Sequence, residues 1–394
     1  MARSIIVAGA RTPIGKLSGA LVGLSAAELG AAAIREALAR AGVAAEAVDA
    51  VLMGEVLQAG QGQNPARKAA VQAGLPMEVR ATTVNKVCLS GLTSIYLADL
   101  MIRADDADIV VAGGMESMTQ APHILPGARA GFRYGGQQLQ DAIIIDGLTC
   151  AFDALPMGEA TDRFAAEESI TRIEQDELAV ASHERAALAI KEGRLGEEIV
   201  ELTIPSRRGD LVVVSTDEGV RVDANLEVMS KLKPAFWSEG TVTAGNSSQL
   251  SDGAAAVVIA SPAAAERLGI TPLAEIIGHG QVAGPGTSLL HQPSRAISDA
   301  LVRSGLTLGE VDLFEISEAF AAVAIASCRQ LSLPKDVVNV NGGAIALGHP
   351  IGMSGTRLAL TLAYELRRRG GGTGVAALCG GGGQGDALLL RTSR

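Results

Sequence analysis

The feature that most constrains the fold is an internal repeat. Residues 33–55 (AIREALARAGVAAEAVDAVLMGE) align without a gap with residues 296–318 (AISDALVRSGLTLGEVDLFEISE), at a constant offset of 263 positions. In both copies, apolar residues follow helical spacing up to a glycine, Gly42 or Gly305, that suits the position after a helix. A short link and a strand pattern follow. The repeat predicts two related α/β halves.

A second matching pair extends the repeat. In each half, a Val-Asn dipeptide precedes a Ser-Gly pair, an apolar helical run and a strand, which is DIVVAGG at 108–114 and GVAAL at 374–378. Strands that alternate with helices indicate mostly parallel sheets covered by helices. The middle differs, with the glycine-rich GARAGFRYGG and a charged helical stretch. We predict an N-terminal half at 1–118 completed by about 249–270, a loop domain at 119–248 and a C-terminal half at 271–394.

Composition narrows the class of protein. The chain has 394 residues, 48% of them hydrophobic, and a net charge of −10, which argues against a broad nucleic-acid surface. The four cysteines show no CxxC, zinc or disulfide-framework spacing, so we expect reduced thiols and no metal. No apolar run reaches the ~18 residues that span a bilayer. With no signal-peptide or transit pattern, we expect a cytoplasmic protein without membrane or nucleic-acid partners.

The segment NKVCLSGLTSI places Cys88 just before an apolar helical run. A helix N-terminus carries partial positive charge and free N–H groups, which lower the pKa of a thiol. Such a cysteine is a candidate nucleophile. The alternative is a small buried cysteine with a packing role, because free cysteine is among the most buried residue types.

Three C-terminal segments also contain candidate functional residues. His349 lies in NVNGGAIALGHPIGMSG, near the place in the second half that corresponds to Cys88, and imidazole is the usual activator of a thiol. Cys379 opens CGGGGQGDA, where three glycines match G-x-G-x-x-G. The dinucleotide interpretation fails because a strand pattern follows and too few residues remain. In ISEAFA, Ser317 and Glu318 are either functional or a helix cap.

Taken together, the whole chain resembles the thiolases of the acetyl-CoA acetyltransferase type. NKVCLSGLTSI resembles the family's nucleophile segment, and NVNGGAIALGHPIGMSG and CGGGGQGDA resemble its two C-terminal signatures. GGMESM, DEGVR and TVTAGNSSQLSDGAAA are also similar to family segments. The resemblance implies a duplicated α/β/α/β/α layered fold with mostly parallel mixed sheets and an inserted loop domain.

The resemblance also implies roles. Cys88 would take the acetyl group as a thioester, and His349 would activate it. Cys379 would remove an α-proton from the second acetyl-CoA. The N–H groups of Cys88 and Gly381 would form an oxyanion hole. Ser317 stands where the family usually has an asparagine that holds a catalytic water, so we expect weakened condensation.

Further implied positions concern coenzyme A and assembly. Coenzyme A and acetyl-CoA would be substrates, with no tightly bound cofactor. Pro156 stands where short-chain members often have histidine, which weakens the assignment of acyl length. The segment 127–140 resembles the family's tetramerisation loop and implies a homotetramer. The implied CoA contacts are Leu148, Met157, Arg221, Phe236, Ala244, Ser248, Ala319 and Phe320.

The predicted function is reversible condensation of two acetyl-CoA to acetoacetyl-CoA and CoA. One alternative is a degradative thiolase that cleaves longer 3-ketoacyl-CoA. Another is a thiolase-like acyl-CoA binder without activity, which only Ser317 supports. A ketoacyl synthase shares the duplicated fold by resemblance, but it would not have a cysteine at position 379. A cysteine hydrolase would leave Cys379 and the CoA-like segments unexplained.

Overall fold

The computed structural model describes residues 4–205 and 209–393. The N-terminal half is built on five strands in the order β4-β3-β5-β10-β1. β3 pairs in parallel with β4 and β5, whereas β10 runs antiparallel to both β5 and β1, so four of these strands share one direction. The strands are β1 (Ile5–Arg11), β3 (Ala50–Gly54), β4 (Arg80–Val84), β5 (Ile109–Ser117) and β10 (Ser251–Ala260), and the short β2 (Gly15–Lys16) pairs with β10.

The C-terminal half repeats this arrangement. Its strands follow the order β12-β13-β14-β11, with β12 parallel to β13, and β14 antiparallel to both β13 and β11. The predicted duplication is therefore confirmed by topology. A short pairing of β1 with β11, at Ile5–Glu275 and Ile6–Ala274, joins the two halves. The strands are β11 (Ala274–Ala283), β12 (Leu313–Ile316), β13 (Gly372–Gly380) and β14 (Gln384–Thr392).

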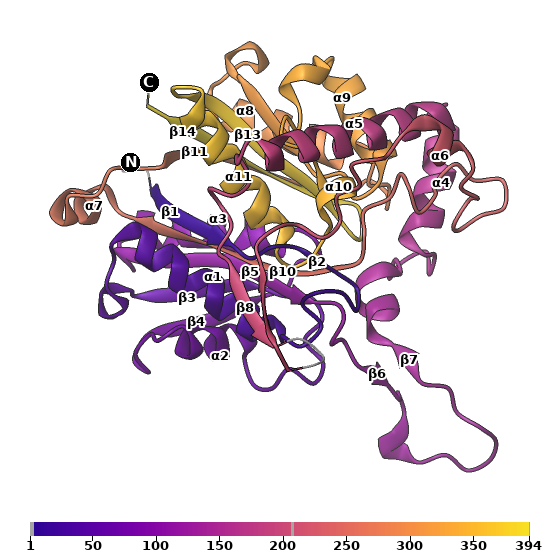
Figure 1. Cartoon of the computed structure of the whole chain (residues 1–394), viewed down its shortest axis with the longest axis horizontal. Helices are drawn as coiled ribbons and strands as arrows, with labels where there is room; N and C mark the ends of the chain where they lie inside the picture. The colour runs from indigo at the N-terminus through magenta and orange to yellow at the C-terminus, as the bar shows by residue number, and fades with distance from the viewer. Residues whose placement is uncertain (1–3, 206–208, 394) are drawn as a thin grey trace.

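Helices form three layers around the two halves (Figure 1). α1 and α2 cover the outer face of the N-terminal half, and α8 packs on the outer face of the C-terminal half beside α9. α3 and α11 lie in contact between the halves and share one apolar core with both sheets. This is the expected α/β/α/β/α layering. The helices are α1 (Ala26–Ala41), α2 (Pro65–Gln72), α3 (Ser90–Arg103), α8 (Gln292–Ser304), α9 (Ala321–Leu331) and α11 (Ser354–Arg368).

Local sequence explains the ends and the burial of these helices. Ser25 and Glu28 form a capping box at the start of α1. Gly42 and Gly305 end α1 and α8 with φ values of 63° and 71°, the left-handed conformation that glycine adopts without a Cβ penalty. α11 is buried on every side over residues 354–366, as a helix between two sheets must be.

The middle of the chain adds smaller elements. A π-helical turn (Ile143–Leu148) and α4 precede the long α5, which begins with a capping box of Thr171 and Glu174. The β6–β7 pair carries an excursion that projects away from the body of the protein (Figure 1). No helix of the described residues has the length and apolarity needed to cross a membrane. The other elements are β6 (His123–Ile124), β7 (Gln140–Asp141), α4 (Met157–Glu167), α5 (Arg172–Lys191), β8 (Leu202–Pro205), β9 (Leu211–Val214), α6 (Leu226–Ser230), α7 (Pro262–Leu268) and α10 (Ala344–Leu347).

Candidate active site

A cavity of about 100 Å³ brings together most of the residues that the sequence singled out. Both cysteines and the histidine line it, although they come from three separate segments in two halves. The predicted residues in its wall are Cys88, Leu148, Met157, Phe236, Ser248, Ala319, Phe320, His349, Cys379 and Gly381.

Seven further lining residues were not predicted. Five of them lie within segments that resemble the family, so a residue-by-residue reading of those segments could have predicted them: Met118, Ser247, Gln249, Leu250 and Ile351. Gly147 and Leu289 carry no signal of their own, because nothing in their local sequence separates them from ordinary packing residues. The seven are Met118, Gly147, Ser247, Gln249, Leu250, Leu289 and Ile351.

The turn between β4 and α3 presents Cys88. Val87 has φ +52°, an uncommon conformation for a β-branched residue, and such strain is concentrated at functional sites. The Ser90 hydroxyl holds the turn by donating to the Val87 carbonyl at 2.6 Å and accepting the Lys86 N–H at 2.8 Å. Lys86 also forms an ion pair with Asp386 of β14 at 2.7 Å. The turn is thereby fixed against the strand that follows the Cys379 loop.

The Cys88 group is a thiol at neutral pH. Burial raises the pKa of Cys88 to about 12, although the backbone N–H groups of Cys88 and Gly381 both lower it. The sequence-based expectation of a lowered pKa at a helix N-terminus is therefore wrong, because burial outweighs the helix. The two N–H groups that act on the sulfur are those predicted for the oxyanion hole. Cys88 is half-buried in the structure, and a thiol with so high a pKa needs a base beside it to react.

His349 has the protonation state of such a base. Its Nδ1 lies 2.6 Å from the Ser354 Oγ, and that hydroxyl donates to the Pro350 carbonyl at 2.9 Å. Because the hydroxyl hydrogen is used there, Nδ1 must be the donor, which leaves Nε2 with a free lone pair. Among the described residues, Nε2 is buried without a partner. Burial lowers the pKa of His349 to about 4, so the ring is neutral at pH 7.

Cys379 is the last but one residue of β13 and is almost fully buried. Burial and the neighbouring Cys88 both raise the pKa of its thiol. Each cysteine is free rather than bonded to the other. Because the two sulfurs influence each other's ionisation, one negative charge at a time is favoured. The glycines that follow form the turn from β13 to β14, with a strand and no helix after it, as the rejection of a dinucleotide site predicted.

Three predicted residues lie outside the cavity wall. Ser317 follows β12, its N–H donates to the Ala377 carbonyl at 2.9 Å, and its buried Oγ has no partner within the described residues. Arg221 is exposed, with its backbone N–H bonded to Nδ1 of His183 at 3.1 Å. Ala244 is exposed as well. These three residues are not part of the wall of this cavity.

The mouth of the cavity is aromatic. Phe236 and Phe320 contact each other edge to face, with ring centroids 6.4 Å apart. Ser248 ties two wall segments together, because its N–H and hydroxyl both donate to the Ala319 carbonyl, at 3.1 and 2.9 Å. Trp237, the single tryptophan of the chain, follows Phe236 directly. Its fluorescence is therefore a natural reporter of ligand entry.

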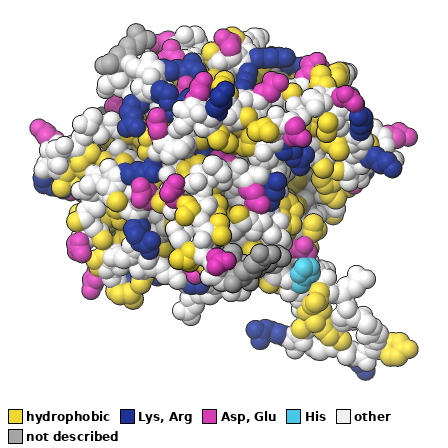
Figure 2. Space-filling model, viewed as in Figure 1, with side chains coloured by type: hydrophobic (Ala, Val, Ile, Leu, Met, Phe, Trp, Pro, Cys, Tyr) yellow, Lys and Arg dark blue, Asp and Glu magenta, His cyan; other side chains and the backbone are white. Residues whose placement is uncertain are grey.

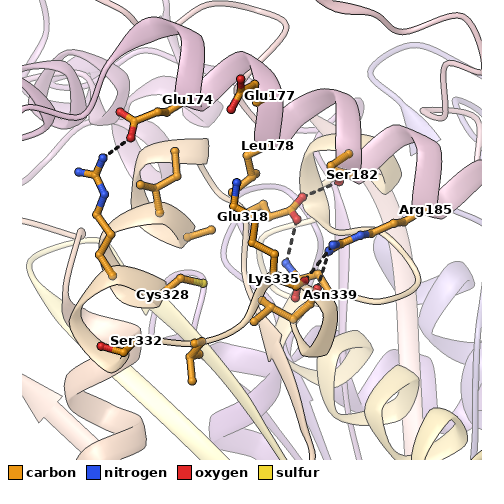
Figure 3. Close-up of a pocket in the computed structure, with 16 residues that line it drawn as sticks. Glu174, Glu177, Leu178, Ser182, Arg185, Glu318, Cys328, Ser332, Lys335 and Asn339 are labelled. Atoms are coloured by element: carbon orange, nitrogen blue, oxygen red, sulfur yellow. Dashed lines mark hydrogen bonds and ion pairs between the residues drawn. The ribbon is translucent and has the colours of Figure 1, made fainter.

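A larger cavity of about 330 Å³ lies between α5 and α9 (Figure 3). The described residues that line it include Cys328 but no histidine, and burial raises the pKa of that thiol to about 11. Glu318 points into it and accepts hydrogen bonds from Ser182 at 2.7 Å and Asn339 at 2.8 Å. The described lining offers Cys328 no imidazole, the usual activator of a thiol, and Glu318 raises rather than lowers the pKa of that thiol. Chemistry, rather than volume, identifies the smaller cavity as the candidate active site.

Comparisons with known proteins identify the family of the chain. The N-terminal thiolase domain model matches residues 4–263 and the C-terminal one matches residues 270–392. A probable acetyl-CoA acetyltransferase of Mycolicibacterium smegmatis is 55% identical, with 98% of this chain and all of the relative aligned. The acetyl-CoA acetyltransferase of Cupriavidus necator is 52% identical, over 98% of each chain. The crystal structure of the Bacillus anthracis acetyl-CoA acetyltransferase superposes with a TM-score of 0.97 and 39% identity over 99% of each chain. The chain therefore belongs to the thiolase family, whose enzymes are acyltransferases.

Proposed function

We propose that this thiolase is an acetyl-CoA C-acetyltransferase, which condenses two acetyl-CoA reversibly to acetoacetyl-CoA and CoA. The observation that carries the proposal is the neutral His349 ring, whose unpartnered Nε2 shares one cavity with two free thiols. A binding protein needs neither a second thiol nor a buried imidazole lone pair. The names of the aligned relatives agree with this chemistry.

The first half-reaction follows from the protonation states. His349 Nε2 takes the proton of Cys88, and the sulfur attacks the thioester carbon of acetyl-CoA. The N–H groups of Cys88 and Gly381 bind the oxyanion that develops. The carbon–sulfur bond to CoA then breaks, and Cys379 gives its proton to the departing CoA sulfur. Acetyl-Cys88, a protonated His349 and a Cys379 thiolate remain.

The second half-reaction restores the starting state. The Cys379 thiolate removes the α-proton of a second acetyl-CoA, while Nε2–H of His349 and a water held near Ser317 bind the thioester oxygen. The resulting carbanion attacks the acetyl carbon on Cys88. The Cys88 sulfur leaves and takes its proton back from His349. Both thiols are then neutral again, and acetoacetyl-CoA is released.

Coenzyme A would enter past the aromatic mouth. The cavity is large enough only for the reacting end of the substrate, so the rest of CoA must lie outside it. Ser248 would contact the pantetheine arm, while the exposed Arg221 and Ala244 would contact the part that reaches the surface. The remaining predicted contacts would line the entrance: Leu148, Met157, Phe236, Ala319 and Phe320.

We also propose a homotetramer, a cytoplasmic location and a place in fatty acid metabolism. The β6–β7 excursion supports the tetramer because it carries exposed apolar side chains away from the body (Figures 1 and 2). Phe132, Tyr134 and Leu139 are 43%, 99% and 63% exposed. Exposed apolar patches of this kind mark interaction surfaces. A second copy of the same excursion is the proposed partner.

Thiolysis of acetoacetyl-CoA by free CoA tests the function. Loss of the acetoacetyl-CoA enolate absorbance should be rapid with the natural chain. Cys88→Ala should lower the rate by more than about 10³-fold, because removing a nucleophile costs at least this much. No turnover by the natural chain, with CoA still quenching or shifting Trp237 fluorescence, would identify a binder instead. A longer 3-ketoacyl-CoA run alongside measures acyl length: the small cavity favours the short substrate, and faster cleavage of the longer one would indicate the degradative alternative.

A further inference from the structure

The loop that carries His349 enters the N-terminal half through Gly352. The Gly352 carbonyl occupies the space where three glycines of that half lack a side chain. A Cβ on Gly54 or Gly91 would lie 2.7 or 2.8 Å from this oxygen, and one on Gly114 would overlap it. The approach is thus possible only because all three positions are glycine. The position of His349 relative to Cys88 depends on this crossing.

Glu116, in β5, holds the His349 loop at Gly352 through hydrogen bonds. Its Oε2 accepts the Gly352 N–H at 2.9 Å and the Val56 N–H at 3.1 Å, and its Oε1 accepts the Leu57 N–H at 3.1 Å. The side chain is fully buried. Three N–H donors favour the ionised carboxylate, which accepts at both oxygens without a hydrogen of its own.

Glu55 is a second buried carboxyl at the same point. A Cβ on Gly352 would lie 2.9 Å from both the Glu55 Cα and the Glu116 Oε2, so the two acids border the same glycine. Within residues 4–205 and 209–393, neither Glu55 oxygen has a hydrogen-bond partner. An unpaired buried carboxylate is costly, so Glu55 keeps its proton while Glu116 carries the charge.

The surrounding charges agree with this division. Burial and the charge of Glu116 raise the pKa of Glu55 to about 9, and Lys68 of α2 opposes them. Burial and Asp252 of β10 raise the pKa of Glu116 to about 7, although its three N–H donors lower it, so Glu116 ionises about two pH units below Glu55. Glu116 in turn raises the pKa of Cys88. The groups that face the pair therefore favour a single negative charge.

We propose that Glu116 is a positioning residue that holds the His349 loop against Cys88 through Gly352, and that it does so only while Glu55 is protonated. The proposal rests on the proposed role of His349 as the base for Cys88. Ionisation of Glu55 would set a second negative charge against Glu116, and the repulsion would displace that carboxylate from the Gly352 N–H. The carboxyl pair thus sets an upper pH limit for catalysis.

Glu116→Gln tests the positioning role. The amide has one acceptor oxygen, and its NH₂ group faces an N–H donor, so the loop loses part of its anchor. We expect kcat for acetoacetyl-CoA thiolysis to fall about 10- to 100-fold, the scale of a lost charged hydrogen bond, with the KM for CoA within about twofold. Glu218→Gln is the matched control, because Glu218 also accepts two backbone N–H groups, from Lys16 and Ala20, but does not contact the loop.

Glu55→Gln tests whether the Glu55 carboxyl must be protonated for catalysis. Glutamine keeps the shape and never ionises, so the variant should fold and be active at pH 7. The kcat of the natural chain should fall as the pH rises through about 9, whereas Glu55→Gln should keep its activity at higher pH. Superimposable pH profiles would refute the role of Glu55.

A second readout separates this inference from the proposed function. Alkylation of Cys88 by iodoacetamide, followed on the Cys88 peptide by mass spectrometry, needs the His349 base but no acyl-CoA chemistry. If the natural chain fails to cleave acetoacetyl-CoA, the proposed function is wrong, yet slower alkylation in Glu116→Gln still supports the positioning role. If Glu116→Gln only lowers Tm and matches Glu218→Gln in both rates, the positioning role is wrong.

Discussion

Two unpartnered atoms define the chemistry at the scale of single residues. His349 Nε2 and Ser317 Oγ are both buried without a hydrogen-bond partner among the described residues. Buried polar atoms are almost always paired, and exceptions in native structures point to catalysis or to an unplaced water. Nε2 can receive a thiol proton directly. Oγ is suited to hold a water, in the place where the resemblance implies an asparagine.

Substituting Ser317 by asparagine tests this interpretation. A serine hydroxyl is short and rotates freely, whereas an amide offers a longer, fixed donor. We expect Ser317→Asn to raise the condensation rate by about two- to tenfold, the equivalent of one net hydrogen bond of about 0.5–1.5 kcal/mol. Steady-state kinetics measures this, with Ser317→Ala as the control that should lower the rate. A rate in Ser317→Asn at or below that of the natural chain contradicts the idea, provided that its Tm is unchanged.

At the scale of elements, α11 does more than fill the central layer. Its first residue, Ser354, fixes the tautomer of His349 by relaying a hydrogen bond to the Pro350 carbonyl. The helix itself is held by burial and by the ion pair of Arg357 with Glu315 at 3.1 Å. A buried helix therefore supplies a rigid support for the base. Precision of this kind is hard to achieve from an exposed loop.

Ser354→Ala should free the tautomer of His349. Part of the population would then carry its proton on Nε2, where it cannot accept from Cys88. We expect the rate of Cys88 acetylation by acetyl-CoA to fall about three- to tenfold, the scale of one hydrogen bond, with Ser354→Thr restoring most of it. Mass spectrometry of rapidly quenched samples gives this rate. An unchanged rate in Ser354→Ala would show that another group sets the tautomer.

The pH dependence of acetylation gives a separate check of His349. Its neutral ring is the base, and its pKa is lowered to about 4, so protonation removes activity only as the pH falls toward 4. Glu116 titrates near pH 7, so the test uses Glu116→Gln, which lacks that carboxyl. The rate of this variant should be flat between pH 5.5 and 7, where a histidine with an ordinary pKa would lose most of its basic form. An acid limb centred near pH 6.5 would contradict the lowered pKa.

Sequence patterns predicted the elements better than their contacts. The repeat gave the two halves and their matching helix ends because periodicity and glycine conformation are local properties. Cys88, His349 and Cys379, which line one cavity, could be singled out because helix starts and glycine-rich turns have local signatures. Burial of Cys88, which reversed its expected pKa shift, depends on packing between distant segments. The roles of Glu55 and Glu116 were not foreseen for the same reason, since they arise only where the halves cross.

At the scale of the whole molecule, corresponding positions in the two halves have different roles. β5 and β13 correspond at the repeat offset, so Cys379 of the second half occupies the place of Glu116 in the first. Likewise, Glu318 corresponds to Glu55. Glu318 accepts hydrogen bonds from Ser182, Asn339 and a backbone N–H, whereas Glu55 has no such partner in the part of the chain that the structure describes. One ancestral position thus serves as the proposed acid/base in one half and as a structural anchor in the other.

Assembly is the remaining property of the whole molecule, and the projecting excursion makes it testable. Replacing Phe132, Tyr134 and Leu139 together by serine removes the apolar surface that a second copy would cover. The active-site cavity does not include these residues, so thiolysis per chain should stay within about twofold of the natural rate.

Light scattering after size-exclusion chromatography measures the mass of the assembly. The natural chain should have the mass of a tetramer, and the triple variant should have about half of it, because a dimer of dimers that loses its tip contacts keeps its larger interface. Val302→Ser is the matched control, since Val302 is 81% exposed on α8, far along the chain from the excursion, and its removal should leave the tetramer intact. A tetramer that survives the triple substitution, or a natural chain with the mass of a monomer, would place assembly elsewhere and leave the excursion without a role between copies.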